Sequence, residues 1–250
     1  MGDFFKCSIC GNEDPRYVGY KNGEPYCRLC ISMHGEQAKE RKVSGGSVVL
    51  RLNYPLSKEQ KEISDKLIRN FNNGIDTLVN AVCGAGKTEL VYHLIAHCLS
   101  QGKRVAFAVP RRDVVIELFM RIKEVFPFNK TVAVYGSHTS NLLGDIVVLT
   151  THQFYRYDNY FDLVILDEID AFPFKDNPLL FSMFERAQKG RIVMMSATPP
   201  DAQIKYFSQQ NKDILELNTR FHRHPLPVPK LLVSRFFKYF IIFRILKKFL

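Results

Sequence analysis

Short apolar runs alternate with helical segments through most of this sequence, and the alternation constrains the fold more than any other feature. The apolar runs, each predicted to be a strand, are 77–82, 104–109, 131–135, 145–150, 162–170, 191–196 and 213–217. The segments with helical periodicity are 56–71, 87–100, 113–126, 179–188 and 201–210. Strands that are apolar along their whole length are typical of a parallel sheet covered on both faces. We therefore expect an α/β domain with a parallel sheet and flanking helices.

The stretch AVCGAGKTE joins the first of these strands to a helix. It matches the phosphate-loop pattern G-x-x-x-x-G-K-[ST], except that Ala81 stands in place of the first glycine. Backbone N–H groups in such a loop surround phosphate oxygens, Lys87 reaches the β- and γ-phosphates, and Thr88 ligates Mg²⁺. A chance glycine-rich turn is the alternative. The predicted nucleotide-binding residues of the loop are Gly84, Ala85, Gly86, Lys87, Thr88 and Glu89.

Two acidic residues end a later apolar run, VILDEID. A nucleotide site needs a carboxylate for Mg²⁺ and a group that orients the attacking water. We assign Asp167 to Mg²⁺ together with Thr88, and Glu168 to the water, so Lys87, Asp167 and Glu168 are the predicted catalytic residues. Asp170 is either part of this motif or only a solvated acid or helix cap.

The run RIVMMS leads into SATPP, where Ser196 and Thr198 place hydroxyl groups at a strand end. These hydroxyls can hydrogen-bond the acidic motif or a neighbouring loop. A Ser/Thr turn before Pro199 is the alternative reading.

Four of the six cysteines lie in the first 30 residues, as CSIC and CRLC separated by 16 residues. Two such pairs have the ligand spacing of a tetrahedral zinc site, and a unit this small needs a metal to fold. A redox role for one CxxC is the lesser alternative. We expect residues 1–43 to be a zinc unit containing a hairpin, 44–56 a linker or strand with a flexible SGGS joint, 57–219 the main domain and 220–250 a basic tail. The predicted zinc ligands are Cys7, Cys10, Cys27 and Cys30.

The motifs AVCGAGKTE, LDEID and SATP, in this order, resemble the first RecA-like lobe of superfamily 2 helicases and translocases, the DEAD/DEAH-box-like group. That group often has Ala at the first loop position. The four-Cys unit, VPRRDVV, TTHQFYRY, DEIDAFPF and RFHRHPLPVP make about residues 5–230 similar to the competence protein ComFA family. DEID replaces the DEAD-type tetrad.

This resemblance implies a RecA-like ATP-binding lobe with ATP, Mg²⁺ and Zn²⁺ as cofactors. It implies ATP hydrolysis that drives single-stranded DNA through the uptake channel during bacterial transformation, with other competence proteins as partners. The expected location is the cytoplasm, at the inner face of the membrane, since the sequence has no secretory signal and no apolar run of transmembrane length.

The resemblance also implies individual roles. Gln60 corresponds to an adenine-reading glutamine, although Ser57-x-x-Gln60 is equally a capping box. Ser196 and Thr198 would couple nucleotide state to DNA. The residues that correspond to the DNA track are Arg111, Arg112, Thr151, His152 and Gln153. For the two arginines, a solvated position at a helix start is the alternative.

The net charge of +10 comes mostly from the end of the chain. Residues 218–250 hold eight Lys and Arg and no acid, which leaves 27 basic and 25 acidic residues before them. The tail sequence FFKYFIIFRILKKFL has no clean amphipathic face, and it is either a membrane-adhering segment, a nucleic-acid-adhering segment or non-native sequence. Global charge alone is therefore weak support for DNA binding.

About 30 residues follow the last predicted strand, too few for the second RecA-like lobe that supplies arginine fingers in this superfamily. We expect a truncated product or fragment, whose second lobe would have to come from another subunit. Two rival functions remain: a replication-restart helicase related to PriA, which has a similar PRR segment, and a non-enzymatic DNA-binding module.

Overall fold

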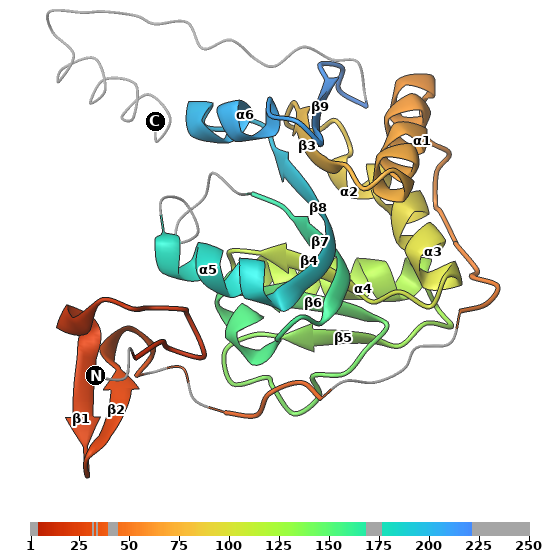
Figure 1. Ribbon diagram of the computed structural model, residues 1–250. Coiled ribbons are helices and arrows are strands. Elements are labelled where there is room, and N and C mark those ends of the chain that lie inside the picture. Colours follow the sequence, from red (N-terminus) through yellow and green to blue (C-terminus); the bar gives the residue numbers. More distant parts are fainter. Residues whose placement is uncertain (1–4, 32, 34, 40–44, 169–176, 222–250) are drawn as a thin grey trace, which may run out of the picture.

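A seven-stranded parallel sheet forms the centre of the computed structural model, which describes residues 5–31, 33, 35–39, 45–168 and 177–221 (Figure 1). The strand order is β5-β6-β4-β7-β8-β3-β9, and every pairing is parallel. The strands are β3 (Asp76–Ala81), β4 (Val105–Val109), β5 (Thr131–Val134), β6 (Ile146–Thr150), β7 (Phe161–Leu166), β8 (Gln188–Ser196) and β9 (Lys212–Leu217). The predicted fold class is confirmed.

Helices cover both faces of this sheet, as its fully apolar strands require. The α-helices are α1 (Lys58–Asn72), α2 (Lys87–Leu90), α3 (Tyr92–Ser100), α4 (Arg112–Val125), α5 (Pro178–Ala187) and α6 (Asp201–Phe207). The 3₁₀ helices are η1 (Pro15–Tyr17), η2 (Arg28–Cys30) and η3 (Thr151–Arg156). One buried cluster joins α1, α3 and α4 to the sheet, and another joins η3, α5 and α6 to the opposite face. Within β4, Phe107 belongs to the first cluster whereas Ala106 and Ala108 belong to the second, which is the alternation expected of a strand.

Three local features differ from the sequence expectation. The single helix predicted over 87–100 is divided at Val91, whose ψ of −7° interrupts the helical ladder between α2 and α3. The strand expected over 162–170 ends at Leu166, so the acidic pair follows the strand instead of extending it. The segment from Thr151 forms the helix η3, which periodicity alone did not indicate.

The N-terminal unit contains the expected hairpin, in which β1 (Val18–Lys21) pairs antiparallel with β2 (Glu24–Cys27). Its turn residues, Asn22 and Gly23, have φ values of 54° and 85°, which is the backbone of a two-residue turn with an Asn-Gly sequence. The unit lies beside α5 in Figure 1, where the Ser182 hydroxyl donates a 2.8 Å hydrogen bond to the Cys10 carbonyl.

The segment that leads into α1 lies against the main domain. Gly46 N–H donates to the Ser100 carbonyl at the end of α3, and Arg51 N–H donates to the Val125 carbonyl at the end of α4. Val48, Leu50 and Leu52 pack against the buried cluster on this face. Residues 45–57 contain no strand, so this segment is a packed connection between the two units.

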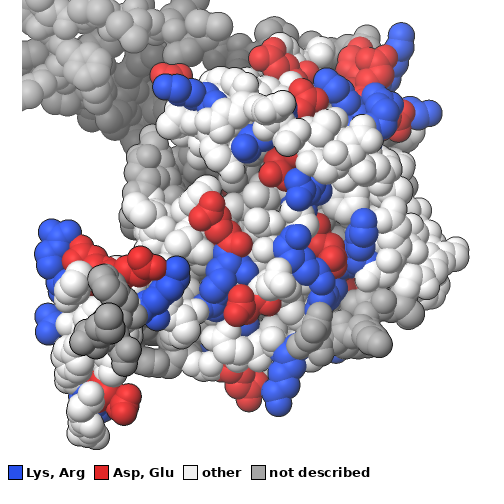
Figure 2. Space-filling model, in the orientation of Figure 1, with Lys and Arg blue, Asp and Glu red and all other residues white. Residues whose placement is uncertain are grey.

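Several sequence expectations fall outside the described residues. These are Asp170, most of DEIDAFPF, all but the first two residues of RFHRHPLPVP and the tail from residue 222. Over the part that the structure does describe, no helix combines the length and apolar character needed to cross a membrane. Figure 2 shows basic and acidic side chains interspersed on one face of the molecule, in keeping with the balanced charge of the sequence before the tail.

Candidate nucleotide site and cysteine cluster

The strand order brings the predicted motifs to one edge of the sheet. In a parallel sheet all carboxyl ends lie at the same edge, and ligands bind beyond them. Across that edge, from β6 through β4, β7 and β8 to β3, lie the Thr151–Gln153 segment, the two arginines, the acidic pair, the SAT segment and the glycine loop (residues 82–86).

The glycine loop turns through left-handed backbone conformations at Gly84 and Gly86, with φ values of 79° and 77°. Residues with a side chain rarely adopt these backbone conformations, so these two positions favour glycine. Ala81 at the end of β3 is fully buried, and its carbonyl accepts a 3.4 Å hydrogen bond from Lys87 Nζ. A strand, a tight glycine turn and the start of a helix thus follow one another here, and the Lys87 ammonium turns back to the strand end.

Gln60 connects helix α1 to this loop. Its Oε1 accepts a 2.9 Å hydrogen bond from Ser57 N–H, while its own N–H donates to Ser57 Oγ, so the predicted capping box is present. Its Nε2 donates a 2.8 Å hydrogen bond to the Ala85 carbonyl. A Cβ on Gly86 would lie 2.5 Å from the same nitrogen. The Gln60 side chain, 3% exposed, thus holds both the start of α1 and the back of the loop.

The acidic pair lies directly beyond β7. Asp167 N–H donates to the Ala108 carbonyl of β4, and Asp167 Oδ1 accepts a 2.9 Å hydrogen bond from Glu168 N–H. Glu168 has a φ of 55°, a conformation that non-glycine residues seldom adopt. Carboxylate and hydroxyl oxygens are the ligands that Mg²⁺ takes, so the chemistry of Asp167 and Thr88 fits that ion.

Glu89, predicted to bind nucleotide, has a protein partner on α4. Its Oε1 accepts a 2.6 Å hydrogen bond from Arg121 Nη2, and Arg121 also lies 3.9 Å from Glu117. This contact fixes the first turn of α2 against α4.

The two predicted DNA-track arginines have different surroundings. Arg111 Nε lies 4.0 Å from Glu168 Oε2. The Arg112 guanidinium lies over the Tyr135 ring, 5.4 Å from its centroid. Adjacent in sequence, the two side chains diverge because Arg111 precedes helix α4 and Arg112 is its first residue.

Of the other three predicted DNA-track residues, the structure exposes one. Thr151 is 1% exposed and Gln153 is buried, with Gln153 Oε1 accepting a 2.7 Å hydrogen bond from Arg156 Nε. His152 is exposed at the start of η3. A ligand at this surface can therefore reach His152, whereas the side chains of Thr151 and Gln153 are buried in the domain.

The SAT segment ends β8 between the acidic pair and the glycine loop. Ser196 is 1% exposed and aligns with Asn80 of β3. Its Oγ accepts a 2.9 Å hydrogen bond from Thr198 N–H. The Ser/Thr turn, one of the two alternatives in the sequence, is thus present.

Sequence reasoning missed two residues that contact the loop. Arg220 Nε donates a 3.1 Å hydrogen bond to the Cys83 carbonyl, and Phe221 N–H donates to the Gly84 carbonyl at 3.1 Å. The segment after β9, where the expected tail begins, therefore lies on the glycine loop. No local pattern indicates this contact, because the two segments are more than 130 residues apart.

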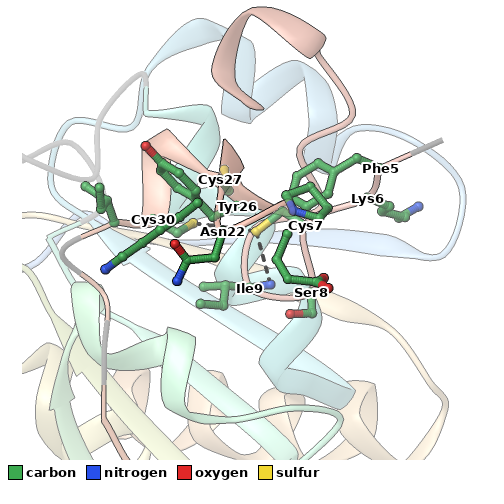
Figure 3. A pocket seen from close by; sticks show the side chains of 13 residues that line it. Phe5, Lys6, Cys7, Ser8, Ile9, Asn22, Tyr26, Cys27 and Cys30 are labelled. Carbon is green, nitrogen blue, oxygen red and sulfur yellow. Dashed lines mark hydrogen bonds between the residues drawn. The ribbon is translucent and has the colours of Figure 1, made fainter. Parts of the chain in front are cut away.

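The four N-terminal cysteines form one compact cluster. Their sulfur atoms all lie within 4.8 Å of one another, with Cys7 to Cys30 at 3.9 Å and Cys10 to Cys27 at 3.7 Å. Ligands at the usual Zn–S distance in a tetrahedral site lie about 3.8 Å apart, so the cluster fits zinc. Figure 3 shows Cys7, Cys27 and Cys30 close together, with Tyr26 beside them. Burial raises the pKa of the Cys10 thiol to about 11, so a bound cation would be needed to keep it ionised.

Several known proteins are similar to this chain in amino-acid sequence. The chain is 34% identical over 241 residues to competence protein ComFA of Bacillus subtilis, covering 90% of this chain and 52% of that protein. It is 33% identical to ComFA of Streptococcus pneumoniae, covering 83% and 50%. It is 30% identical to the replication restart protein PriA of Rickettsia conorii, covering 76% and 31%. The chain thus spans about half the length of the ComFA relatives it matches.

Solved structures share the fold at low sequence identity. The helicase domain of Pyrococcus furiosus Hef superposes with a TM-score of 0.53 at 13% identity, covering 70% of this chain and 41% of that one.

The sequence profile described as DEAD/DEAH box helicase matches residues 58–207, which is more than half of the chain. With the glycine loop, the acidic pair and the SAT segment on one sheet edge, this match shows that the chain belongs to the DEAD/DEAH box helicase family.

Proposed function

We propose that this chain is the ATP-binding lobe of a ComFA-like DNA translocase, in which ATP hydrolysis drives single-stranded DNA uptake during bacterial transformation. The observation that carries the proposal is the order of motifs along the sheet edge. The acidic pair after β7 lies between the glycine loop on one side and the exposed arginines after β4 on the other. The acidic pair can therefore respond both to a nucleotide at the glycine loop and to DNA at the arginines.

At the nucleotide end, the loop N–H groups and Lys87 would bind the phosphates of ATP. Thr88 and Asp167 would hold Mg²⁺, which supplies charge neutralisation at the β- and γ-phosphates. Glu168 would orient the attacking water and accept its proton. Gln60 Nε2 donates to the Ala85 carbonyl, so we assign Gln60 first to holding the loop. Its second amide hydrogen would serve a contact with adenine.

At the other end, Arg111, Arg112 and His152 would contact the DNA backbone. Phosphate contacts fix position without reading bases, which suits a protein that moves along any sequence. Ser196 and Thr198, between the two ends, would transmit the nucleotide state. The cysteine cluster would hold Zn²⁺ and stiffen the N-terminal unit against α5.

Hydrolysis in this family needs a second RecA-like lobe, which supplies cationic groups worth roughly 10³–10⁵ in rate. We propose that such a lobe completes the cleft, from this polypeptide or another subunit. The proposed partners are single-stranded DNA, the uptake channel and other competence proteins. The proposed place of action is the cytoplasmic face of the membrane.

The test is ATP hydrolysis by the purified chain with and without single-stranded DNA, beside Glu168→Gln and Lys87→Ala. DNA-stimulated turnover that Glu168→Gln abolishes would support the enzyme assignment. ATP binding without turnover would support a lobe that needs its partner. A Lys87→Ala variant that binds ATP as tightly as the wild type would refute the site.

The similarity to PriA supports a second candidate, a replication-restart helicase. A restart enzyme should prefer forked duplexes, whereas an uptake motor should prefer plain single strands. Comparing the two substrates in the same hydrolysis assay separates the candidates.

A further inference from the structure

Two neighbouring strands bring Arg111 to Glu168. β4 and β7 are paired, with Ala108 opposite Leu166, and each of the two residues lies two positions beyond its strand's end. The resulting distance from Arg111 Nε to Glu168 Oε2 is 4.0 Å. The register of the sheet therefore imposes this pairing.

The Glu168 carboxylate needs a partner at this oxygen. Oε2 is buried, and among the residues that the structure describes it accepts no hydrogen bond. Glu168 also has a φ of 55°, which carries backbone strain for a residue with a side chain. Such strain persists only where the surroundings hold it, and Arg111 is the cationic side chain that the described residues place beside this carboxylate.

Arg111 is also open to solvent. Its side chain is 68% exposed, and it makes no capping hydrogen bond at the start of α4. Arg112, by contrast, is engaged by the Tyr135 ring. An anion arriving at this surface thus meets one arginine whose existing partner is a weakly held carboxylate.

We propose that Arg111 is shared between Glu168 and a phosphate of single-stranded DNA, so that DNA binding withdraws Arg111 from Glu168. This inference rests on the proposed function, and it makes Arg111 a positioning residue for Glu168. When the arginine turns to the phosphate, Glu168 is released to orient water. Stimulation of ATP hydrolysis by DNA then follows from the competition between Glu168 and a DNA phosphate for Arg111.

Competition has a reciprocal consequence that can be measured without hydrolysis. If DNA binding must break the Arg111–Glu168 pair, the pair lowers the DNA affinity by a certain factor. Removing the Glu168 charge should then raise the DNA affinity by the same factor. Partly exposed ion pairs correspond to factors of roughly 1.4 to 5. The effect should require Arg111 and should not require Arg112.

The experiment measures the affinity of the full chain for a fluorescent oligothymidine by anisotropy, at low salt and without nucleotide. The variants are Glu168→Gln, Arg111→Gln, Arg112→Gln and the two double variants that combine Glu168→Gln with each arginine change. We expect Glu168→Gln to tighten binding roughly 1.4- to 5-fold in the wild-type and Arg112→Gln backgrounds, and to change nothing in the Arg111→Gln background. Arg111→Lys should restore the response to Glu168→Gln.

Two results would overturn the inference, and they differ. Equal tightening in both arginine backgrounds would mean that Glu168 acts only as a general negative charge, which leaves the proposed function intact. A wild-type chain that binds no oligothymidine would overturn the inference together with the DNA part of the proposed function. Thermal unfolding of each variant, expected within a few degrees of wild type at these partly exposed sites, establishes that the comparison is between folded proteins.

Discussion

Replacing Gln60 tests the claim that one side chain holds both α1 and the glycine loop. Gln60→Ala removes two hydrogen bonds of opposite sense, the 2.9 Å bond accepted from Ser57 N–H and the 2.8 Å bond donated to the Ala85 carbonyl. It also leaves the Ala85 carbonyl without this donor in a buried region. Both segments should lose stability together.

The magnitude follows from these contacts. The bond from Ser57 N–H contributes about 0.5–1.5 kcal/mol, and the Ala85 carbonyl left unsatisfied costs about 1–3 kcal/mol, a cost that already includes its lost bond. The free energy of unfolding should therefore fall by about 3 kcal/mol. For a domain of this size that corresponds to a Tm lower by about 6–12 °C. The nucleotide affinity should also fall, because the loop loses its support.

Two further variants separate the roles of Gln60. Ser57→Ala removes the side-chain cap and should cost about 1 kcal/mol without changing nucleotide affinity. Gln60→Glu keeps an acceptor for Ser57 N–H but turns a carboxylate toward the Ala85 carbonyl, so it should weaken nucleotide binding at pH 7. The measurements are thermal unfolding and titration with a fluorescent ATP analogue. A Tm of Gln60→Ala within about 2 °C of wild type, or a Gln60→Glu affinity equal to wild type, would refute the reasoning.

Three other predictions address the loop, the cysteine cluster and pH. Gly86→Ala should lower the Tm more than Gly74→Ala, because both glycines have left-handed φ but only at Gly86 would a Cβ lie 2.5 Å from another side chain; similar losses in unfolding scans would argue against the close contact. The purified chain should carry one zinc ion by elemental analysis, and Cys27→Ser should lose it and unfold at lower temperature, whereas a metal-free wild type of unchanged Tm would disprove a structural metal. Burial raises the pKa of the Asp213 carboxyl, but hydrogen bonds from Asn70 and Lys66 outweigh burial and hold the pKa below the usual value of an aspartate. The stabilisation is thus present above the unfolded-state pKa of this carboxyl and is lost as the pH falls through the folded-state pKa. Urea titrations should therefore show that Asp213→Asn has a lower free energy of unfolding than wild type at pH 7, and that this difference shrinks as the pH is lowered toward 3.

Sequence patterns predicted the features that depend on near neighbours. The run from β3 through the glycine loop into α2 could be located because a strand, a glycine turn and a helix start are contiguous. The N-terminal hairpin and the Ser57 capping box were likewise local, and both are present. Element boundaries shifted by one to four residues, as at Leu166, because the end of a strand depends on its partners.

Contacts between distant segments could not be predicted in the same way. The sequence offered two interpretations of Gln60, an adenine contact and a capping box. The structure has the capping box, through the amide oxygen, and adds a contact that neither interpretation included, from the amide nitrogen to the Ala85 carbonyl. Arg111 and Arg112 looked equivalent, and only the neighbouring segments distinguish them. Arg220 was grouped with a tail, but it lies on the Cys83 carbonyl.

The sequence by itself determined which elements form and which chemical groups end the strands, because periodicity and turn chemistry act over a few residues. Only the tertiary structure decided that β7 lies between β4 and β8. This order puts Arg111 Nε 4.0 Å from Glu168 Oε2 and puts the SAT segment at the end of the strand on the other side. The physical reason is that strand order results from the packing of a whole sheet between two layers of helices, and no short stretch of residues carries that information.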